Sequence, residues 1–147
     1  MNLVALWLHL LGVSVWLGGL AYQAHVLRPL AATEGRATFA AAAARARPVT
    51  WTAIALVVLT GFYNVTTLGP LARVMESGAG LLLAGKFILV ILAVALAGQR
   101  DFAHVPRLRA AASDDAAAAL RTIAWLDRVV LGLGVVIVYL GLAVSRA

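Results

Sequence analysis

Two polar side chains stand inside otherwise apolar stretches of this sequence, the imidazole of His9 and the amine of Lys86. An imidazole nitrogen can coordinate a transition metal or a haem iron, and an amine can pair with an anion. A polar side chain inside a membrane helix is costly unless it has a partner, so such residues mark a site by default. The alternatives are a structural hydrogen bond for His9 and, for Lys86, a side chain extended to the outer interface.

The helix face that carries His9 also carries two gaps and one large ring. At 100 degrees per residue, Gly12, Trp16, Gly19 and Gln23 fall within about 80 degrees of one another on this face. Glycines let another backbone or a flat ligand come close. A porphyrin site in a helical bundle needs an axial nitrogen and room for the macrocycle. We therefore predict that His9 is a metal ligand and that Gly12, Trp16 and Gly19 line a cofactor site, with haem b as the cofactor.

The composition is that of a membrane protein. Hydrophobic residues make up 63% of the chain and charged residues 12%, whereas soluble domains carry roughly 25% charged residues. Apolar runs over about 3–27, 48–68, 80–99 and 122–145 predict an all-α, integral membrane four-helix bundle, with residues 1–147 forming one domain. The chain has no cysteine, which excludes disulfides, thiolate metal sites and iron–sulfur clusters.

The connections between the apolar runs differ in charge. Arginines gather between the first and second runs and between the third and fourth, whereas the connection between the second and third is poor in them. The positive-inside rule then places both Arg-rich connections in the cytoplasm and both termini on the outer side. The net charge of +6 follows from this orientation, so we expect membrane lipid and no nucleic acid as a partner.

This orientation brings polar groups of four spans to one depth in the outer half of the membrane. Those residues are His9, Thr60, Asn64, Lys86 and Tyr139. Gly134 and Gly141 leave room on the fourth span. We predict a polar pocket inside the bundle, with Asn64, Lys86 and Tyr139 binding the cofactor and Lys86 serving as the catalytic residue.

The cytoplasmic connections carry signals of further helix. Thr33 can cap a helix through 37–46, and Ser113 is a good start for the fourth helix. The stretch from Arg100 to Pro106 is expected to close the third helix. Asp127, at the inner end of the fourth span, is expected to pair with an arginine of these connections.

Two further histidines lie toward the cytoplasmic side. His25 points about 160 degrees away from His9 on an ideal helix, and His104 falls in a connection. An interfacial position suits both residues. A second, inner site that uses both stays open.

Three runs resemble the CopD-type membrane domain and its HemJ-type protoporphyrinogen oxidase relatives. They are LHLLGVSVWLGG (Leu8–Gly19), RPVTWTAIALVVLTGFYN (Arg47–Asn64) and AGKFILVILAVAL (Ala84–Leu96). The HemJ resemblance implies that His9 and Lys86 are the functional pair and that the cofactor is b-type haem. Both resemblances imply a multi-pass protein of the bacterial cytoplasmic (inner) membrane. The chain departs from the HemJ pattern at Gly98 and Gln99, where a Tyr-His pair is expected, and it lacks an Asn-Glu-x-Pro motif in the fourth span.

Three functions follow from these residues. The first is b-type haem binding for electron transfer or porphyrin oxidation, with a redox partner protein and with enzyme activity left open. The alternative is copper resistance or uptake, with His9 and Met75 as ligands, although Cu(I) prefers thiolate and thioether donors and the only methionines are Met1 and Met75. The third is a non-catalytic assembly factor or accessory subunit. Homo-oligomers fit all three, because four apolar helices have faces to spare.

Overall fold

A computed structural model describes residues 2–31, 35–67, 78–110 and 113–144 of the chain. These residues form four helical rods, each long and apolar enough to cross a membrane. The first rod comprises α1 (Leu3–Tyr22), η1 (Gln23–Leu27) and α2 (Arg28–Leu30), and the second is α3 (Arg36–Thr66). The third comprises α5 (Gly78–Gly98), η2 (Gln99–His104) and α6 (Val105–Ala110), and the fourth is α7 (Ser113–Val144). The predicted all-α membrane bundle is confirmed.

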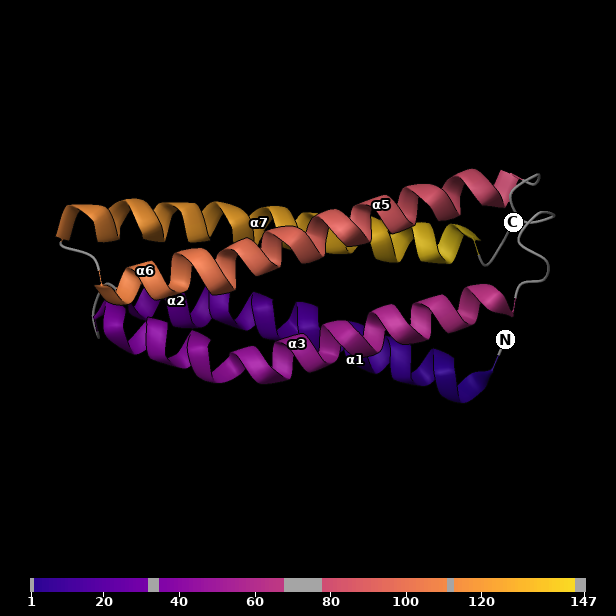
Figure 1. Cartoon of the computed structure of the whole chain (residues 1–147), viewed down its shortest axis with the longest axis horizontal. Coiled ribbons are helices and arrows are strands. Elements are labelled where there is room, and N and C mark those ends of the chain that lie inside the picture. Colours follow the sequence, from indigo (N-terminus) through magenta and orange to yellow (C-terminus); the bar gives the residue numbers. More distant parts are fainter. Residues whose placement is uncertain (1, 32–34, 68–77, 111–112, 145–147) are drawn as a thin grey trace.

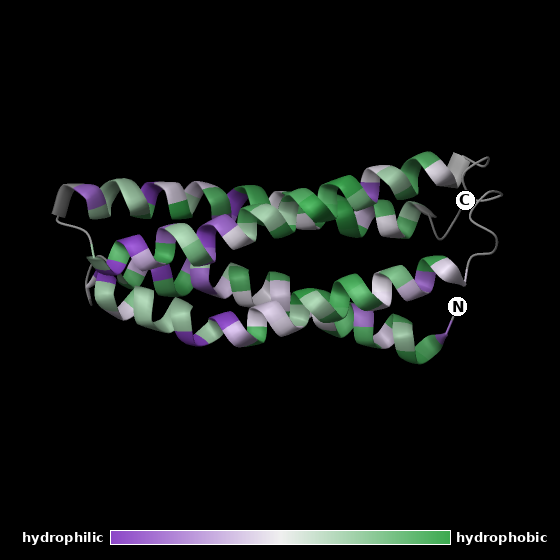
Figure 2. Ribbon diagram, in the orientation of Figure 1, coloured by the Kyte–Doolittle hydropathy of each residue, from purple (hydrophilic) through white to green (hydrophobic). Residues whose placement is uncertain are grey.

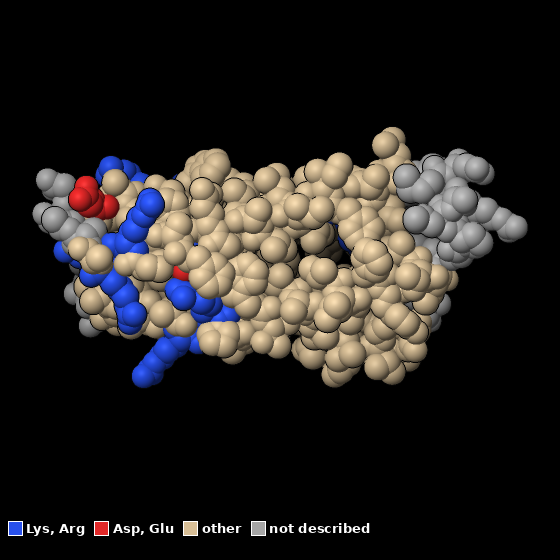
Figure 3. Space-filling view, viewed as in Figure 1, with Lys and Arg blue, Asp and Glu red and all other residues tan. Residues whose placement is uncertain are grey.

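The rods lie side by side, with α1 packed on α3 and α5 packed on α7 (Figure 1). Helix α1 begins and α7 ends at the same end of the bundle, while α2 and α6 lie at the opposite end. We call the half in which α1 begins the outer half and the other the inner half, after the predicted orientation. On the face shown, Lys and Arg gather at the inner end, and apolar side chains cover most of the rest (Figures 2 and 3). This distribution fits the positive-inside rule, although the orientation itself stays a prediction.

The inner end is a packed extension of the bundle. Helix α3 already begins at Arg36 and α7 at Ser113, as the helix signals in the connections predict; the expected cap Thr33 lies outside the described residues. Burial of small and branched side chains against each other holds these extensions together. The buried cluster consists of Phe39, Ala40, Ala43, Val105, Leu108, Ala116, Ala119 and Ile123. A second buried cluster fills the middle of the bundle and consists of Trp16, Leu20, Ala53, Ile54, Ala93, Ala97 and Val130.

The third rod does not end between Arg100 and Pro106, contrary to the prediction. It continues to Ala110 through the π-helical segment η2. Proline in a helix clashes with the carbonyl group four residues earlier, which for Pro106 belongs to Phe102, inside η2. The same relation holds in the first rod, where Pro29 follows η1. In these two rods the helix continues past the proline after a wide turn, whereas Pro48 lies inside α3 without one.

The outer surface of the bundle suits lipid. Large apolar side chains with more than half of their area exposed occur on all four rods, among them Trp7, Leu59, Ile91 and Val135. No soluble domain leaves so much apolar surface in contact with water. The exposed faces are therefore consistent with contact with membrane lipid, whereas a homo-oligomer stays a prediction.

Candidate functional site

His9 is held by helix α3 through one of its two ring nitrogens. Nδ1 lies 3.0 Å from the carbonyl oxygen of Val57 and 3.0 Å from Oγ1 of Thr60. A carbonyl oxygen only accepts, so Nδ1 carries the proton and donates. The Thr60 hydroxyl donates in turn to the carbonyl oxygen of Leu56, at 2.5 Å, and so accepts from His9. This arrangement fixes the tautomer in which Nε2 has a free lone pair.

Glycine 61 makes the close approach of His9 possible. A Cβ atom at this position would lie 3.2 Å from Cε1 of the His9 ring, which is tighter than ordinary van der Waals contact. The ring therefore sits against the backbone of α3, half-buried in the bundle. Its Nδ1 is oriented by a backbone carbonyl, an arrangement that metal-binding histidines also use and that a purely structural histidine can share.

Lys86 reaches from α5 to the fourth helix. A Cβ atom on Gly141 would lie 3.0 Å from Nζ of Lys86, so the amine lies against the backbone of α7. Lys86 is also close enough to His9 for a Coulombic interaction. Their meeting at one depth stays a prediction.

A hollow opens on one face of the outer half (Figure 3). Part of a Lys or Arg side chain is visible inside it. Lys86 is the only Lys or Arg in the outer half among the residues that the structure describes. A cationic side chain of the outer half is thus reached from outside the bundle.

The remaining predicted site residues are spread over different surroundings. The space beside Gly12 is taken by Val57, whose Cγ2 would lie 2.8 Å from an added Cβ. Trp16 is 4% exposed and belongs to the middle cluster, while no atom lies within 4 Å of a Cβ added at Gly19. The side-chain oxygen of Asn64 is buried without a hydrogen-bond partner in the described part of the chain. Tyr139 is 69% exposed, so it faces away from the bundle interior.

Glycines that were expected to admit a flat macrocycle are filled by side chains. Gly12 receives Val57, and Gly134 on α7 receives Leu17, whose Cδ2 would lie 2.6 Å from an added Cβ. Both glycines therefore serve close helix packing. Space for a flat ligand is therefore taken at Gly12 and Gly134, whereas Gly19 has no atom within 4 Å of an added Cβ.

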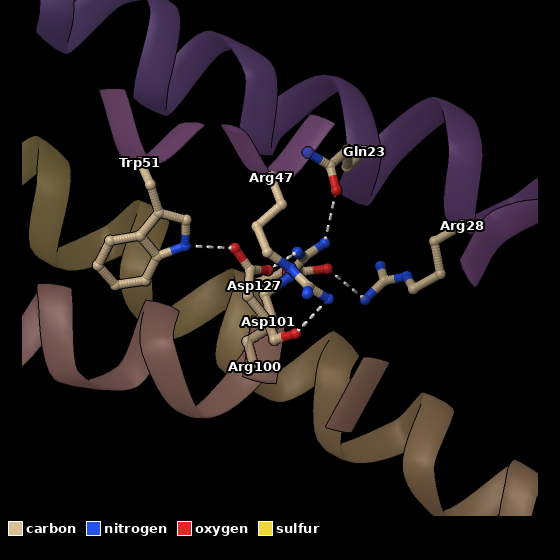
Figure 4. A network of polar contacts seen from close by, with 7 residues as sticks. All are labelled: Gln23, Arg28, Arg47, Trp51, Arg100, Asp101 and Asp127. Atoms are coloured by element: carbon tan, nitrogen blue, oxygen red, sulfur yellow. Dashed lines mark hydrogen bonds and ion pairs between the residues drawn. The ribbon is translucent and has the colours of Figure 1, made fainter. Parts of the chain in front are cut away.

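A second polar cluster lies in the inner half, around Arg100 of η2 (Figure 4). Its Nε donates to Oδ1 of Asp127 at 2.6 Å, its Nη1 to Oδ1 of Asp101 at 2.6 Å, and its Nη2 to Oε1 of Gln23 at 3.0 Å. All four side chains are at most 5% exposed. A buried charge is tolerable only when it is paired and hydrogen-bonded in this way.

Two further arginines and a tryptophan extend this cluster. Nη2 of Arg47 donates to the carbonyl oxygen of Asp101 at 2.8 Å, and Nε1 of Trp51 donates to Oδ2 of Asp101 at 3.1 Å. Nη1 of Arg28 lies 3.6 Å from Oδ2 of Asp127. Together these residues join all four rods, and we call them the ionic network. Its seven members are Gln23, Arg28, Arg47, Trp51, Arg100, Asp101 and Asp127.

A scan against protein-family models supplies the family. The model of copper resistance protein D (CopD) matches residues 40–144. The chain belongs to the CopD family. Comparisons with curated proteins and with solved structures gave no match. Family membership and the four spans together make this CopD protein a multi-pass protein of the inner membrane.

The matched region covers three of the four rods. It includes Lys86, Arg100, Asp101 and Asp127, whereas His9 and Gln23 precede it. The match favours the copper alternative over haem, for which it offers no support. The match likewise gives no support to the resemblance to HemJ-type proteins.

Sequence reasoning found part of the polar interior of this CopD protein. The expected pairing of Asp127 with arginines of the inner connections is confirmed by Arg28 and Arg100. The burial of Arg100 and Asp101 was not predicted, because the third helix was expected to end at these residues. Sequence reasoning also placed Gln23 on the His9 face, whereas its amide oxygen binds Arg100.

The other histidines of the CopD protein stand apart from both clusters. His25 is exposed, and its Nδ1 lies 3.0 Å from the carbonyl oxygen of Ala21. His104 is half-buried in η2. Over the described ranges, no group of three or more His, Cys, Asp or Glu side chains could hold a metal ion, so a preformed multi-ligand centre is not what these residues build. Met75, the other expected copper ligand, lies outside the described residues.

Proposed function

We propose that this CopD-family protein handles copper in the membrane, for resistance or uptake, and that copper is its substrate. The family match over residues 40–144 is the observation that carries this proposal. The outer half supplies the matching chemistry. His9 offers Nε2 as a donor, and its ring is oriented by Val57 and Thr60, as in metal sites whose second shell fixes the ligand.

A weak site fits passage of copper better than its storage. Cu(I) binds most tightly to thiolates and thioethers, and imidazole is a moderate ligand for copper. The chain has no cysteine, and the described residues bring together no set of three His, Cys, Asp or Glu ligands. Conduction requires binding that is strong enough for entry and weak enough for release. A single half-buried histidine in the outer half fits that requirement.

Uptake of copper by reconstituted vesicles tests the proposal. The purified chain is inserted into liposomes that contain bathocuproine disulfonate, a coloured Cu(I) chelator, and Cu(I) is added outside without oxygen. We expect colour to develop faster than in protein-free liposomes of the same lipid. Equal rates would contradict copper transport. A Soret band that sharpens with its α and β bands on reduction of the purified protein would favour haem instead.

A further inference from the structure

The outer half has an unusual charge balance for a protein that takes up a cation. Among the residues described there, Lys86 is the only basic side chain besides His9, and no Asp or Glu is present. The described carboxylates of Asp101, Asp115 and Asp127 all belong to the inner half. A free copper ion entering the outer half would therefore meet, among the described residues, a positive group and no carboxylate.

The amine of Lys86 is available for a ligand. No hydrogen bond or ion pair within the described part of the chain engages its Nζ, which lies against the backbone of Gly141. The side chain is half-buried, and a cationic side chain is visible in the hollow of this half (Figure 3). A charge in such a position acts strongly on a nearby ion, because little water screens it.

We propose that Lys86 selects the charge class of the substrate, so that the outer half takes Cu(I) in complex with anionic ligands and not as a free cation. The ammonium group pairs with the anion, while Nε2 of His9 faces the metal. Lys86 on α5 and His9 on α1 both belong to the outer half, at the depth that the sequence predicts for the site, and so act on the same complex. This inference rests on the proposed copper function.

Dichlorocuprate(I) is a suitable probe, since the same metal can be offered as an anion or as a cation. Liposomes with entrapped bathocuproine disulfonate receive Cu(I) either in sodium chloride, where it forms the dichloro anion, or as its cationic acetonitrile complex in sodium gluconate. Initial rates are corrected by those of protein-free liposomes. For the unaltered protein, we expect the anionic complex to enter about tenfold faster, the order of effect expected from one poorly screened charge.

Two variants separate charge from structure. Lys86→Gln should bring the ratio of the two rates close to one, chiefly by slowing the anionic complex. Lys86→Arg keeps the charge and should keep the ratio. Gel filtration and circular dichroism check that both variants fold. If one variant does not fold, the rate ratio of the unaltered protein still tests the inference.

Three results would overturn the inference. One is a rate ratio near one for the unaltered protein, and another is a ratio that Lys86→Gln leaves unchanged. The third is a Lys86→Gln protein that takes up neither form, which would make the amine a copper ligand. In all three cases copper uptake by the unaltered protein can still exceed that of empty liposomes, so the proposed function survives. No uptake in either medium would remove both.

Discussion

Nε of Arg100 and Oδ1 of Asp127 meet at 2.6 Å inside the bundle, although 27 positions separate the two residues in the sequence. Neither side chain reaches the surface, since Asp127 is 0% exposed and Arg100 is 3% exposed. This contact lies at the centre of the ionic network, which fastens the inner half of all four rods. The outer half has no such network in its described residues, and a hollow opens on its surface (Figure 3).

Removing the carboxylate of Asp127 should destabilise the bundle strongly. Asp127→Ala leaves the buried guanidinium of Arg100 without its main partner, at a cost of about 3–5 kcal/mol in the free energy of unfolding. Unfolding in detergent, followed by circular dichroism, measures this loss. Asp115→Ala, at an exposed site on the same helix, is the matched control and should change little. Equal losses in both variants would contradict a special role for the network.

A methyl group at Gly12 should weaken the contact between α1 and α3. The new Cβ would lie 2.8 Å from Cγ2 of Val57 and 3.1 Å from the carbonyl oxygen of Ala53, and backbone cannot give way cheaply. We expect Gly12→Ala to cost about 1–3 kcal/mol of stability. Gly18→Ala, where no atom lies within 4 Å of the added Cβ, should be neutral or slightly stabilising. The same unfolding measurement compares them, and a neutral Gly12→Ala would refute the close packing.

Copper affinity should depend on His9 and on the hydroxyl that orients it. His9→Ala removes Nε2 and should abolish binding, whereas Thr60→Val removes only an acceptor of the Nδ1 proton and should weaken binding about tenfold. A competition titration with a coloured Cu(I) chelator gives both values. Thr60→Ser retains the hydroxyl and should bind normally, as should Thr52→Val on the exposed side of α3. Full affinity in His9→Ala would exclude His9 as a ligand.

Single cysteines can decide the orientation of the bundle, because the chain has no cysteine of its own. Thr66 at the outer end of α3 and Arg109 at the inner end of the third rod are both exposed. In spheroplasts, a membrane-impermeant maleimide should label Thr66→Cys at once and Arg109→Cys only after permeabilisation. The reverse pattern would place both termini in the cytoplasm and would show that the positive-inside argument fails here.

Hydropathy and charge were sufficient to predict the bundle. Four apolar runs separated by arginines predict four spans, and start signals such as Ser113 predict that α7 begins well before its apolar run. The placement of His9 and Lys86 in the same half of the bundle followed from depth alone, because both helices begin at the same end. These predictions rest on one-dimensional patterns that the membrane makes reliable.

Details that depend on helix contacts were not predictable in this way. A helical wheel drawn at 100 degrees per residue places Gly12 on the His9 face, but it cannot predict that the side chain of Val57 fills the space beside Gly12. It also fails at Gln23, because η1 begins there and the turn widens. The burial of Arg100 depends on Gln23 and Asp127, which belong to two other rods, so a local sequence pattern cannot predict it.

The two π-helical segments belong to a pattern of spacing and contacts that occurs twice in the chain. Position 9 to position 23 and position 86 to position 100 both span fourteen residues, and each interval leads from an outer polar residue to a polar residue in a wide turn. His9 rests on Gly61 of the helix that follows it, and Lys86 rests on Gly141 of the helix that follows it. In each of the two packed helix pairs, a polar side chain of the first helix thus rests against a glycine of the second. The side chain is an imidazole in one pair and an amine in the other, so the two pairs present different chemistry at this contact.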